Sequence, residues 1–411
     1  MKRRGTPTQL LCILTGLNLF NYLDRYVLNA VRTPMALEFG IDYGDSGRLF
    51  TAFMIGYFIT SPFFGYLGDR MSRKLLIILG ILVWSAGTVL TGVAQGFGAL
   101  LFYRAMVGVG EASYATLGPA VISDSWPPVQ RNNALTVFYV AIPVGSALGY
   151  LLGGTVAAVS GWRYAFFVAG APGLLLALLL LPFREPERGE SEALPEGGLP
   201  RPGLGDLARL FRNGDYNLAV WGYVAYTFAL GAFAFWGPTF LERVHGLSLE
   251  RADAFFGAVV VGAGLIGTLL GGFGATWWQR RNPAGYASTL GCSVLLSVPL
   301  SFFALLSRST PAAMGLLAAS IFLLFFCTGP INTLILEAVP VNVRSSAMAT
   351  SIFMIHLFGD MWSPECVGRL ADHLGHDLQR AILILPGVLV FAGLLWMALA
   401  IKTARRGVAS L

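Results

Sequence analysis

The sequence contains twelve mainly apolar stretches of roughly 20 residues, the length an α-helix needs to cross a bilayer. This pattern confines the chain to helices, because backbone polar groups in lipid must be satisfied within each spanning helix. Hydrophobic residues make up 55% of the 411 residues and charged residues 12%, so a soluble fold could not cover its surface. We predict an all-α membrane protein with spans over about 8–31, 47–69, 74–94, 98–122, 133–158, 162–182, 216–241, 252–279, 284–306, 312–335, 343–368 and 380–401.

The basic residues lie mostly in loops on one side of the predicted membrane. With a cytoplasmic amino terminus, 18 of the 28 Lys and Arg residues fall in cytoplasmic segments and eight in external ones, while Arg25 and Arg104 lie within spans. Cytoplasmic loops of membrane proteins carry such an excess. This predicts two cytoplasmic termini in a plasma membrane, and the lack of an Asn-x-Ser/Thr acceptor site favours a bacterial inner membrane. The net charge of +6 follows from topology, so no nucleic-acid partner is predicted.

Residues 183–215 interrupt the apolar pattern. They are rich in Arg, Glu, Pro and Gly and end in a short amphipathic stretch, Leu204–Arg212. Six spans precede them and six follow, which is typical of transporters built from two repeated halves. We predict a six-helix bundle over 1–182, a cytoplasmic linker with an interfacial helix over 183–215 and a second bundle over 216–411. The predicted oligomeric state is a monomer.

The loop between spans 2 and 3 reads Gly65-Tyr-Leu-Gly-Asp-Arg-Met-Ser-Arg-Lys74 and resembles the signature loop of the major facilitator superfamily. Glycines let helices approach closely, and an aspartate is stabilised at a helix amino terminus. The resemblance implies that this aspartate meets the start of span 11 and closes the cytoplasmic side. The predicted gating residues are Gly65, Gly68, Asp69, Arg70 and Arg73, with Glu337 and Arg344 flanking the loop after span 10. The basic residues also fit a purely topological role.

Other segments resemble the spinster branch of that superfamily. They are Asn21–Arg25, Arg104–Ala112, Gly161–Arg163, Arg184–Pro186, Trp236–Pro238 and His356–Pro364. The similarity extends over essentially the whole chain. Spinster-like proteins transport lysolipids and sphingosine phosphate in animals, so the resemblance implies a lipid substrate.

Four ionisable residues and one amide lie within predicted spans 1 and 4. From the helix rise, Asp24 and Arg25 lie roughly 9–11 Å below the outer surface, Arg104 roughly 9 Å and Glu111 roughly 20 Å. Arg104 and Glu111 are two turns apart on one helix face, and Asn21 lies one turn below Asp24. If spans 1 and 4 face one another, as the superfamily resemblance implies, these five residues form one polar column.

Two interpretations of this polar column stay open. In the structural one, ion pairs such as Asp24 with Arg104 only hold two helices together. In the functional one, Arg25 and Arg104, with Asn21, bind an anionic head group, because a guanidinium matches phosphate or carboxylate geometry. Asp24 and Glu111 then exchange protons, since burial favours a protonated carboxyl group and a nearby arginine favours the ionised one. A carboxylate that takes up a proton when the substrate leaves the arginine would couple substrate to proton movement.

The second half contributes apolar and aromatic residues to predicted spans 7 and 10. Tyr226, Trp236 and Asn332 are the predicted substrate contacts there. A site that is charged on one side and apolar on the other suits an amphiphile, although some of these aromatic residues fit a lipid-facing role equally well. His356 and Asp360 lie one turn apart in span 11, where helix packing is favoured over a proton relay.

Together these features predict a secondary transporter that moves an amphiphilic lipid, such as a lysophospholipid or sphingolipid, by alternating access with proton coupling. Two alternatives remain: a proton-coupled drug or organic-anion transporter, and an uncoupled lipid scramblase or sensor. The expected partners are the substrate, protons and membrane lipids. No cofactor or metal is predicted, and no nucleophile–base pair suggests an enzyme.

Overall fold

The computed structural model describes residues 6–40, 43–192 and 203–409, and within these ranges it contains helices and no strand. Nine helices in this part of the chain are long and apolar enough to cross a membrane. The other three predicted spans are α1 (Pro7–Ala30), α5 (Phe97–Ser125) and an interrupted span made of α14 (Arg344–Ile355), η3 (His356–Asp360) and α15 (Ser363–His373). Buried charges in α1 and α5 and a break in the last explain why these three look less like apolar spans.

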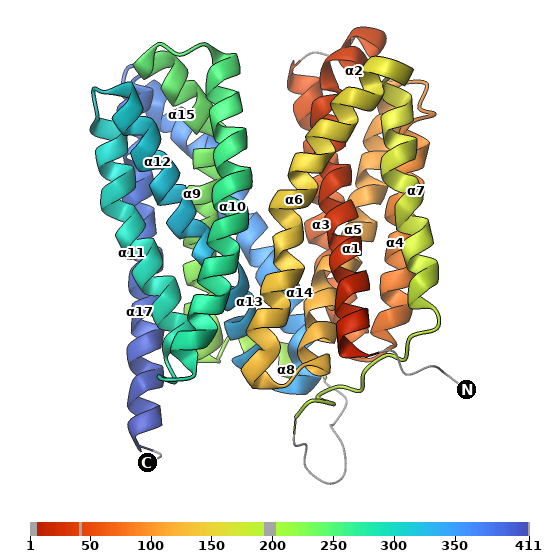
Figure 1. Ribbon diagram of the computed structural model, residues 1–411, viewed down its shortest axis with the longest axis vertical. Helices are drawn as coiled ribbons and strands as arrows, with labels where there is room; N and C mark the ends of the chain where they lie inside the picture. The colour runs from red at the N-terminus through yellow and green to blue at the C-terminus, as the bar shows by residue number, and fades with distance from the viewer. Residues whose placement is uncertain (1–5, 41–42, 193–202, 410–411) are drawn as a thin grey trace. The chain divides into compact units, whose positions relative to one another are not determined.

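The chain forms two compact units, whose elements can be followed in Figure 1. Unit 1 contains the described residues up to Leu207 together with Pro340–Phe353, and unit 2 contains Ala208–Val339 and the described residues from Met354 onward. Most of α14 therefore packs with the first half of the chain, although it lies in the second half of the sequence. The division within this span falls between Phe353 and Met354, in the last turn of α14.

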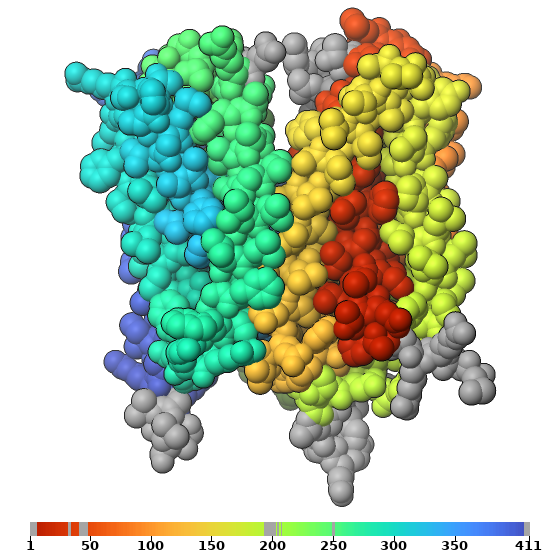
Figure 2. Space-filling view, in the orientation of Figure 1, coloured from red at the N-terminus to blue at the C-terminus, as the bar shows by residue number. Residues whose placement is uncertain are grey.

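Unit 1 is built mainly from long helices in which α1 packs between α6 and α7, as Figure 2 shows on one face. Helix α5 packs against α3 and α4. Thr6 caps α1 in a capping box with Gln9, and Gly161 separates α6 from α7 with φ of 92°, a value that favours glycine. The bounds not yet given are α2 (Arg32–Phe39), α3 (Tyr43–Gly68), α4 (Arg73–Thr91), α6 (Pro128–Ser160) and α7 (Trp162–Leu180).

Unit 2 begins within the short helix α8 (Leu204–Leu210), which lies in the predicted amphipathic stretch. Helix α17 packs against α9 and α11, and α11 also packs against α12. The bounds are α9 (Gly214–His245), α10 (Leu249–Gln279), α11 (Gly285–Leu306), α12 (Thr310–Leu324), η1 (Phe325–Cys327), α13 (Thr328–Glu337), α16 (Leu378–Ile382) and α17 (Ile384–Ala409), with a short turn η2 (Val341–Val343) in unit 1.

Spans 10 and 11 are interrupted at points that the sequence pattern did not predict. Span 10 tightens into the 3-10 turn η1, and span 11 widens into the π-helical η3, where Gly359 leaves helical geometry with φ of −101° and ψ of −105°. Glycine at position 231 of α9 leaves room for this break, because a methyl group there would lie 2.7 Å from Cβ of Asp360. Such interruptions are common at functional hinges, and both are held by α9.

Glycines also let α3 and α5 touch at the level of their backbones. A methyl group at Gly108 would lie 2.1 Å from the carbonyl oxygen of Phe53, and one at Gly56 would lie 2.4 Å from that of Ala105. Neither neighbour can move away cheaply, since both are backbone atoms. This close packing brings the aromatic residues of α3 beside the charged residues of α5.

We expect Gly108→Ala to lower the stability of the protein by about 1–3 kcal/mol through overpacking. Gly98→Ala is the matched control on the same helix, because a methyl group there meets nothing within 4 Å. The measurement is the apparent melting temperature of the detergent-solubilised protein. Equal melting temperatures for the two variants would contradict the proposed backbone contact.

Candidate functional site

The five residues of the polar column come together within unit 1. Asn21 and Asp24 on α1 and Arg104 and Glu111 on α5 are at most 2% exposed. The side chain of Arg25 on α1 is 19% exposed. The predicted juxtaposition of spans 1 and 4 is therefore present in the structure.

The ion pair in the polar column is not the expected pair of Asp24 with Arg104. Arg25 Nε donates to Glu111 Oε2 at 2.6 Å, so the arginine beside Asp24 pairs with the glutamate of α5. Asp24 Oδ2 instead accepts a hydrogen bond from Thr88 Oγ1 of α4. The expected pairing of Asp24 with Arg104 is wrong in its detail, because helix rotation places Arg25 against Glu111.

Aromatic rings surround the arginines of the column. The Arg25 guanidinium carbon lies 4.8 Å from the ring centre of Tyr22 and 4.9 Å from those of Phe53 and Tyr57. That of Arg104 lies 5.1 Å from the Phe53 ring. Cation–π contacts of this kind stabilise a charge that has been removed from water. The rings also give the column apolar walls, contributed by α1 and α3.

Several polar atoms of the column have no hydrogen-bond partner among the described residues. They are Asn21 Nδ2, Asp24 Oδ1, Arg104 Nε and Nη1, and Glu111 Oε1. Each such atom costs about 1–3 kcal/mol when buried without a partner. Donors and acceptors both remain unused, so the column can accept an anion on Arg104 and protons on the two carboxyl groups.

The signature loop lies at the predicted cytoplasmic end of unit 1. Asp69 Oδ1 accepts from the backbone N–H of Ser345 at 3.0 Å, and Asp69 Oδ2 accepts from that of Ser346 at 2.9 Å. These groups begin α14, where the helix dipole favours an anion. Burial nevertheless raises the pKa of Asp69 above its ordinary value, against these two hydrogen bonds.

The glycines of the loop make the contact between Asp69 and the start of α14 possible. A methyl group at Gly65 would lie 2.4 Å from Cβ of Ala349, and one at Gly68 would lie 2.1 Å from a methyl group of Leu117. Arg70, in contrast, folds back on its own helix, with its guanidinium carbon 3.4 Å from the Tyr66 ring centre. The loop thus contains packing residues and one helix-capping carboxylate.

A buried charge network lies beside the contact between Asp69 and α14. Asp124 accepts hydrogen bonds from Arg73 and, at 3.0 Å, from Arg344. Glu192 accepts from Arg344 at 2.6 Å and from Arg131. Hydrogen bonds from the two arginines hold the pKa of Glu192 below its ordinary value, although burial alone would raise it. The network joins α4, α5, α6, α14 and the chain after α7 within unit 1.

Sequence reasoning missed the residues that follow α7. Glu185 accepts from the backbone N–H of Arg73 at 2.8 Å and from the Ser72 hydroxyl, so it caps α4. Arg188 donates to the carbonyl oxygens of Gly68 and Met71 at 2.8 and 2.9 Å. We call residues 184–192 the linker strap. The sequence predicts only a cytoplasmic linker here, and the hydrogen-bond partners of its charged residues show that this part of it packs against unit 1.

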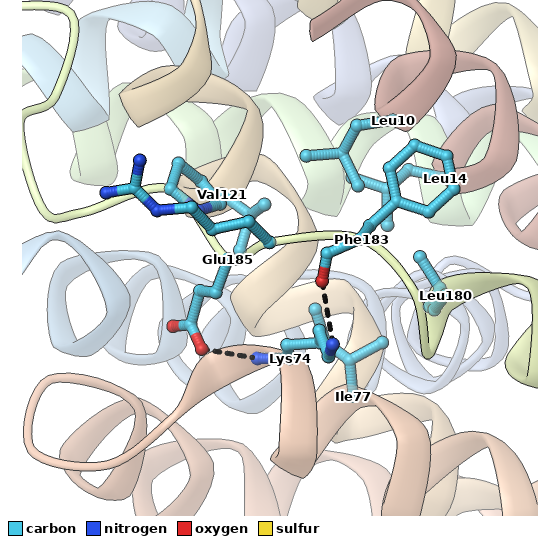
Figure 3. Close-up of a pocket in the computed structure, with 10 residues that line it drawn as sticks. Leu10, Leu14, Lys74, Ile77, Val121, Leu180, Phe183 and Glu185 are labelled. Atoms are coloured by element: carbon cyan, nitrogen blue, oxygen red, sulfur yellow. Dashed lines mark hydrogen bonds between the residues drawn. The ribbon is translucent and has the colours of Figure 1, made fainter. Parts of the chain in front are cut away.

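A small pocket, partly open to solvent, lies where the linker strap leaves α7 (Figure 3). Lys74 donates to the carbonyl oxygens of Leu181 and Phe183 at 2.7 Å, which fixes the chain above it. No residue of the polar column lines this pocket. Its lining consists of Leu10, Leu14, Lys74, Ile77, Val121, Leu180, Phe183, Arg184, Glu185 and Pro186.

The substrate contacts predicted on unit 2 use their donors within that unit. The Tyr226 hydroxyl donates to the Leu324 carbonyl oxygen at 2.9 Å, beside η1. Trp236 Nε1 donates to the Pro364 carbonyl oxygen and Asn332 Nδ2 to that of Thr328, both at 2.8 Å. These side chains therefore stabilise the interrupted spans, and they would offer a substrate mainly apolar surface.

Two further predicted groups have separate local environments in unit 2. His356 Nδ1 lies 2.9 Å from Asp360 Oδ1 across η3, so this pair braces the break in span 11. Glu337 is exposed at the end of α13. Arg344, its predicted gating partner, bonds Asp124 and Glu192 as described above.

Comparison with known proteins agrees with the fold. Residues 14–364 match the family model of the Major Facilitator Superfamily. A bacterial homolog of the human lysosomal transporter Spinster superposes with a TM-score of 0.67 at 23% identity, covering 97% of this chain and 98% of that structure. The human organic anion transporter MFSD10 superposes with a TM-score of 0.76 at 16% identity, covering 96% and 100%. The protein is thus a membrane transporter with the twelve-helix fold of that superfamily.

Proteins of similar sequence show which family of the superfamily the chain belongs to. The chain is 34% identical to Protein spinster homolog 3 of Danio rerio, over 96% of this chain and 85% of the relative. It is 30% identical to the Arabidopsis thaliana protein called "Probable sphingolipid transporter spinster homolog 1", over 96% and 89%. It is 33% identical to Protein spinster of Drosophila melanogaster over 90% of this chain, and spans 62% of that protein's length. The chain belongs to the spinster family.

We expect Glu192→Gln to destabilise the protein by about 1–3 kcal/mol, because Arg131 and Arg344 lose a charged acceptor. The folded-state pKa of Glu192 is below its ordinary value, so this contribution is present above pH of about 4.5 and is lost as the pH falls through the folded-state pKa. The melting-temperature difference from wild type should shrink accordingly in acid.

Glu187→Gln is the control for this prediction, because its side chain is 77% exposed and pairs with Arg184. We expect a change within about 0.5 kcal/mol. If the Glu192 variant behaves like this control, Glu192 does not hold the network.

Proposed function

We propose that this spinster-family transporter moves an amphiphile with an anionic head group, such as a lysophospholipid or sphingolipid, and couples its movement to protons. The observation that carries the proposal is the buried Arg25–Glu111 ion pair with unused polar atoms of Asp24 and Arg104 beside it. Unpaired ionisable groups within a membrane span are costly, and they persist where transport needs them. The name of the Arabidopsis relative supports a lipid substrate.

The coupling follows from competition for the guanidinium groups. An anionic head group that binds Arg104 and Arg25 weakens the hold of Arg25 on Glu111. Glu111 then loses its counter-ion in a low-dielectric environment and takes up a proton, since an isolated buried carboxylate is unfavourable. Release of the head group restores the ion pair and expels the proton. Binding of substrate and of proton are thereby linked through one arginine. This order is the reverse of the one predicted from the sequence, because Arg25 is already paired with Glu111 and a bound anion would compete for it.

The aromatic walls and the contacts of the signature loop complete the proposal. Tyr22, Phe53 and Tyr57 offer apolar surface next to the charges, which suits the junction of a head group and an acyl chain. Asp69, Arg73 and Arg344 form contacts at the opposite end of unit 1 that we propose must break and form during alternating access. From the charge distribution, we place both termini on the cytoplasmic side of a bacterial inner membrane.

We expect Arg104→Ala to reduce uptake of a labelled lysophospholipid into proteoliposomes at least tenfold, since removing a buried charged partner costs about 2–5 kcal/mol. Arg369→Ala is the control, because the side chain of Arg369 is 75% exposed and its ion pair with Glu365 contributes little. Unlabelled small organic anions are included as competitors. Competition by these anions but not by lysolipids would favour the organic-anion alternative.

We expect Glu111→Gln to bind the same lysolipid with a Kd within about threefold of wild type, but to take it up equally with and without an imposed pH gradient. The amide keeps the shape of the side chain and cannot carry a proton. Glu365→Gln serves as the control. A wild-type response to the gradient in the Glu111 variant would remove Glu111 from the coupling, and gradient-independent movement in the wild type would indicate passive flipping.

A further inference from the structure

Thr88 lies on α4, which contributes no residue to the predicted polar column. It is fully buried, and α7 packs closely against it, since a methyl group at Gly170 would lie 3.2 Å from Cβ of Thr88. Its hydroxyl oxygen stands between two oxygens. One is the carbonyl oxygen of Trp84, 3.0 Å away, and the other is Asp24 Oδ2.

A hydroxyl group has one hydrogen to donate and can accept others. The carbonyl oxygen of Trp84 can only accept. When Asp24 is ionised, it too can only accept, so the Thr88 hydrogen points to Asp24. When Asp24 is protonated, its O–H can donate to Thr88 Oγ1, and the Thr88 hydrogen turns to Trp84. Both protonation states of Asp24 are therefore hydrogen-bonded with the same heavy-atom positions.

We propose that Thr88 is a positioning residue that keeps Asp24 in one place while its proton comes and goes. This inference rests on the proposed proton coupling. In the described ranges, Thr88 provides the one hydrogen bond to the Asp24 carboxyl group, whose Oδ1 has no partner. The charged groups that act on Asp24 through space are Arg104 and Glu111 of α5 and Arg25 of its own helix.

The arrangement leaves Asp24 Oδ1 available to the column. With Oδ2 anchored on α4, the other carboxylate oxygen can face Arg104 or a substrate group without losing its fixed position. A carboxyl group held only by through-space charges would be free to rotate as those charges changed. Because of Thr88, the Asp24 side chain can gain or lose a proton without moving.

The test is the pH dependence of lysophospholipid uptake for Thr88→Val, which replaces the hydroxyl with a methyl group of similar size. The ionised carboxylate loses a charge-assisted hydrogen bond and the protonated form loses only an ordinary one, so the ionised form is destabilised more. We expect the midpoint of the pH profile to move upward by about one unit. Thr88→Ser should restore the wild-type midpoint.

Thr91→Val is the matched control on the same helix. Thr91 is also fully buried and donates to the carbonyl oxygen four residues earlier, that of Gly87, at 2.8 Å, and among the described residues it forms no hydrogen bond to a carboxylate. It should keep the wild-type midpoint. If Thr88→Val does not fold, Thr88→Ala removes the hydroxyl without adding a methyl group.

Infrared difference spectra between acid and alkaline pH provide a readout that needs no substrate. The carboxyl band that disappears in Asp24→Asn should shift in Thr88→Val and stay in place in Thr88→Ser and Thr91→Val. If wild-type uptake is independent of the pH gradient, the proposed coupling fails, while the infrared bands still decide the role of Thr88. A coupled wild type with no shift in either readout for Thr88→Val, or with no Asp24-dependent band, overturns the inference.

Discussion

The ion pair between Arg25 and Glu111 is the interaction on which the arrangement of unit 1 depends. A carboxylate and a guanidinium within membrane spans each cost several kcal/mol, and their attraction offsets this only when geometry and surrounding dipoles are favourable. Here the geometry is good at 2.6 Å, and three aromatic rings lie against the arginine. Close packing of α3 on α5 brings two of these rings into place, and it requires glycine at positions 56 and 108. The close packing at these glycines therefore also determines the surroundings of the buried charges.

Much of this arrangement can be recognised in the sequence. Span lengths and charge distribution predict the helices, because lipid permits few alternatives, and the spacing of Arg104 and Glu111 predicts a shared face. The partner of each charge could not be predicted, since Asp24 and Arg25 are adjacent and a rotation of α1 by one residue exchanges them. Thr88 escaped notice for a related reason. A single hydroxyl in an apolar span is ordinarily satisfied by its own helix, and only the tertiary structure shows the carboxylate beside it.

The interruptions of spans 10 and 11 were equally beyond the sequence pattern. Gly359 alone does not predict a break, because glycine is common inside membrane helices. The break depends on α9, where Thr227 lies against Ile355 and Gly231 leaves space for Asp360. Local composition cannot reveal a helix whose geometry is set by its neighbour. The same holds for the linker strap, whose glutamates are ordinary linker residues until their arginine partners are known.

The two charge clusters of unit 1, the network around Asp124 and Glu192 and the polar column, differ in how fully their polar atoms are hydrogen-bonded. At the predicted cytoplasmic end, Asp124 and Glu192 each accept from two arginines, and Asp69 uses both oxygens on backbone N–H groups. Such a network holds its elements together and has little capacity for a further ligand. In the polar column the opposite is true, because four residues keep unpartnered atoms although they are almost fully buried. A fold selected for stability alone would replace such groups with apolar residues. Their retention agrees with the proposal that protons and an anionic ligand enter and leave the column.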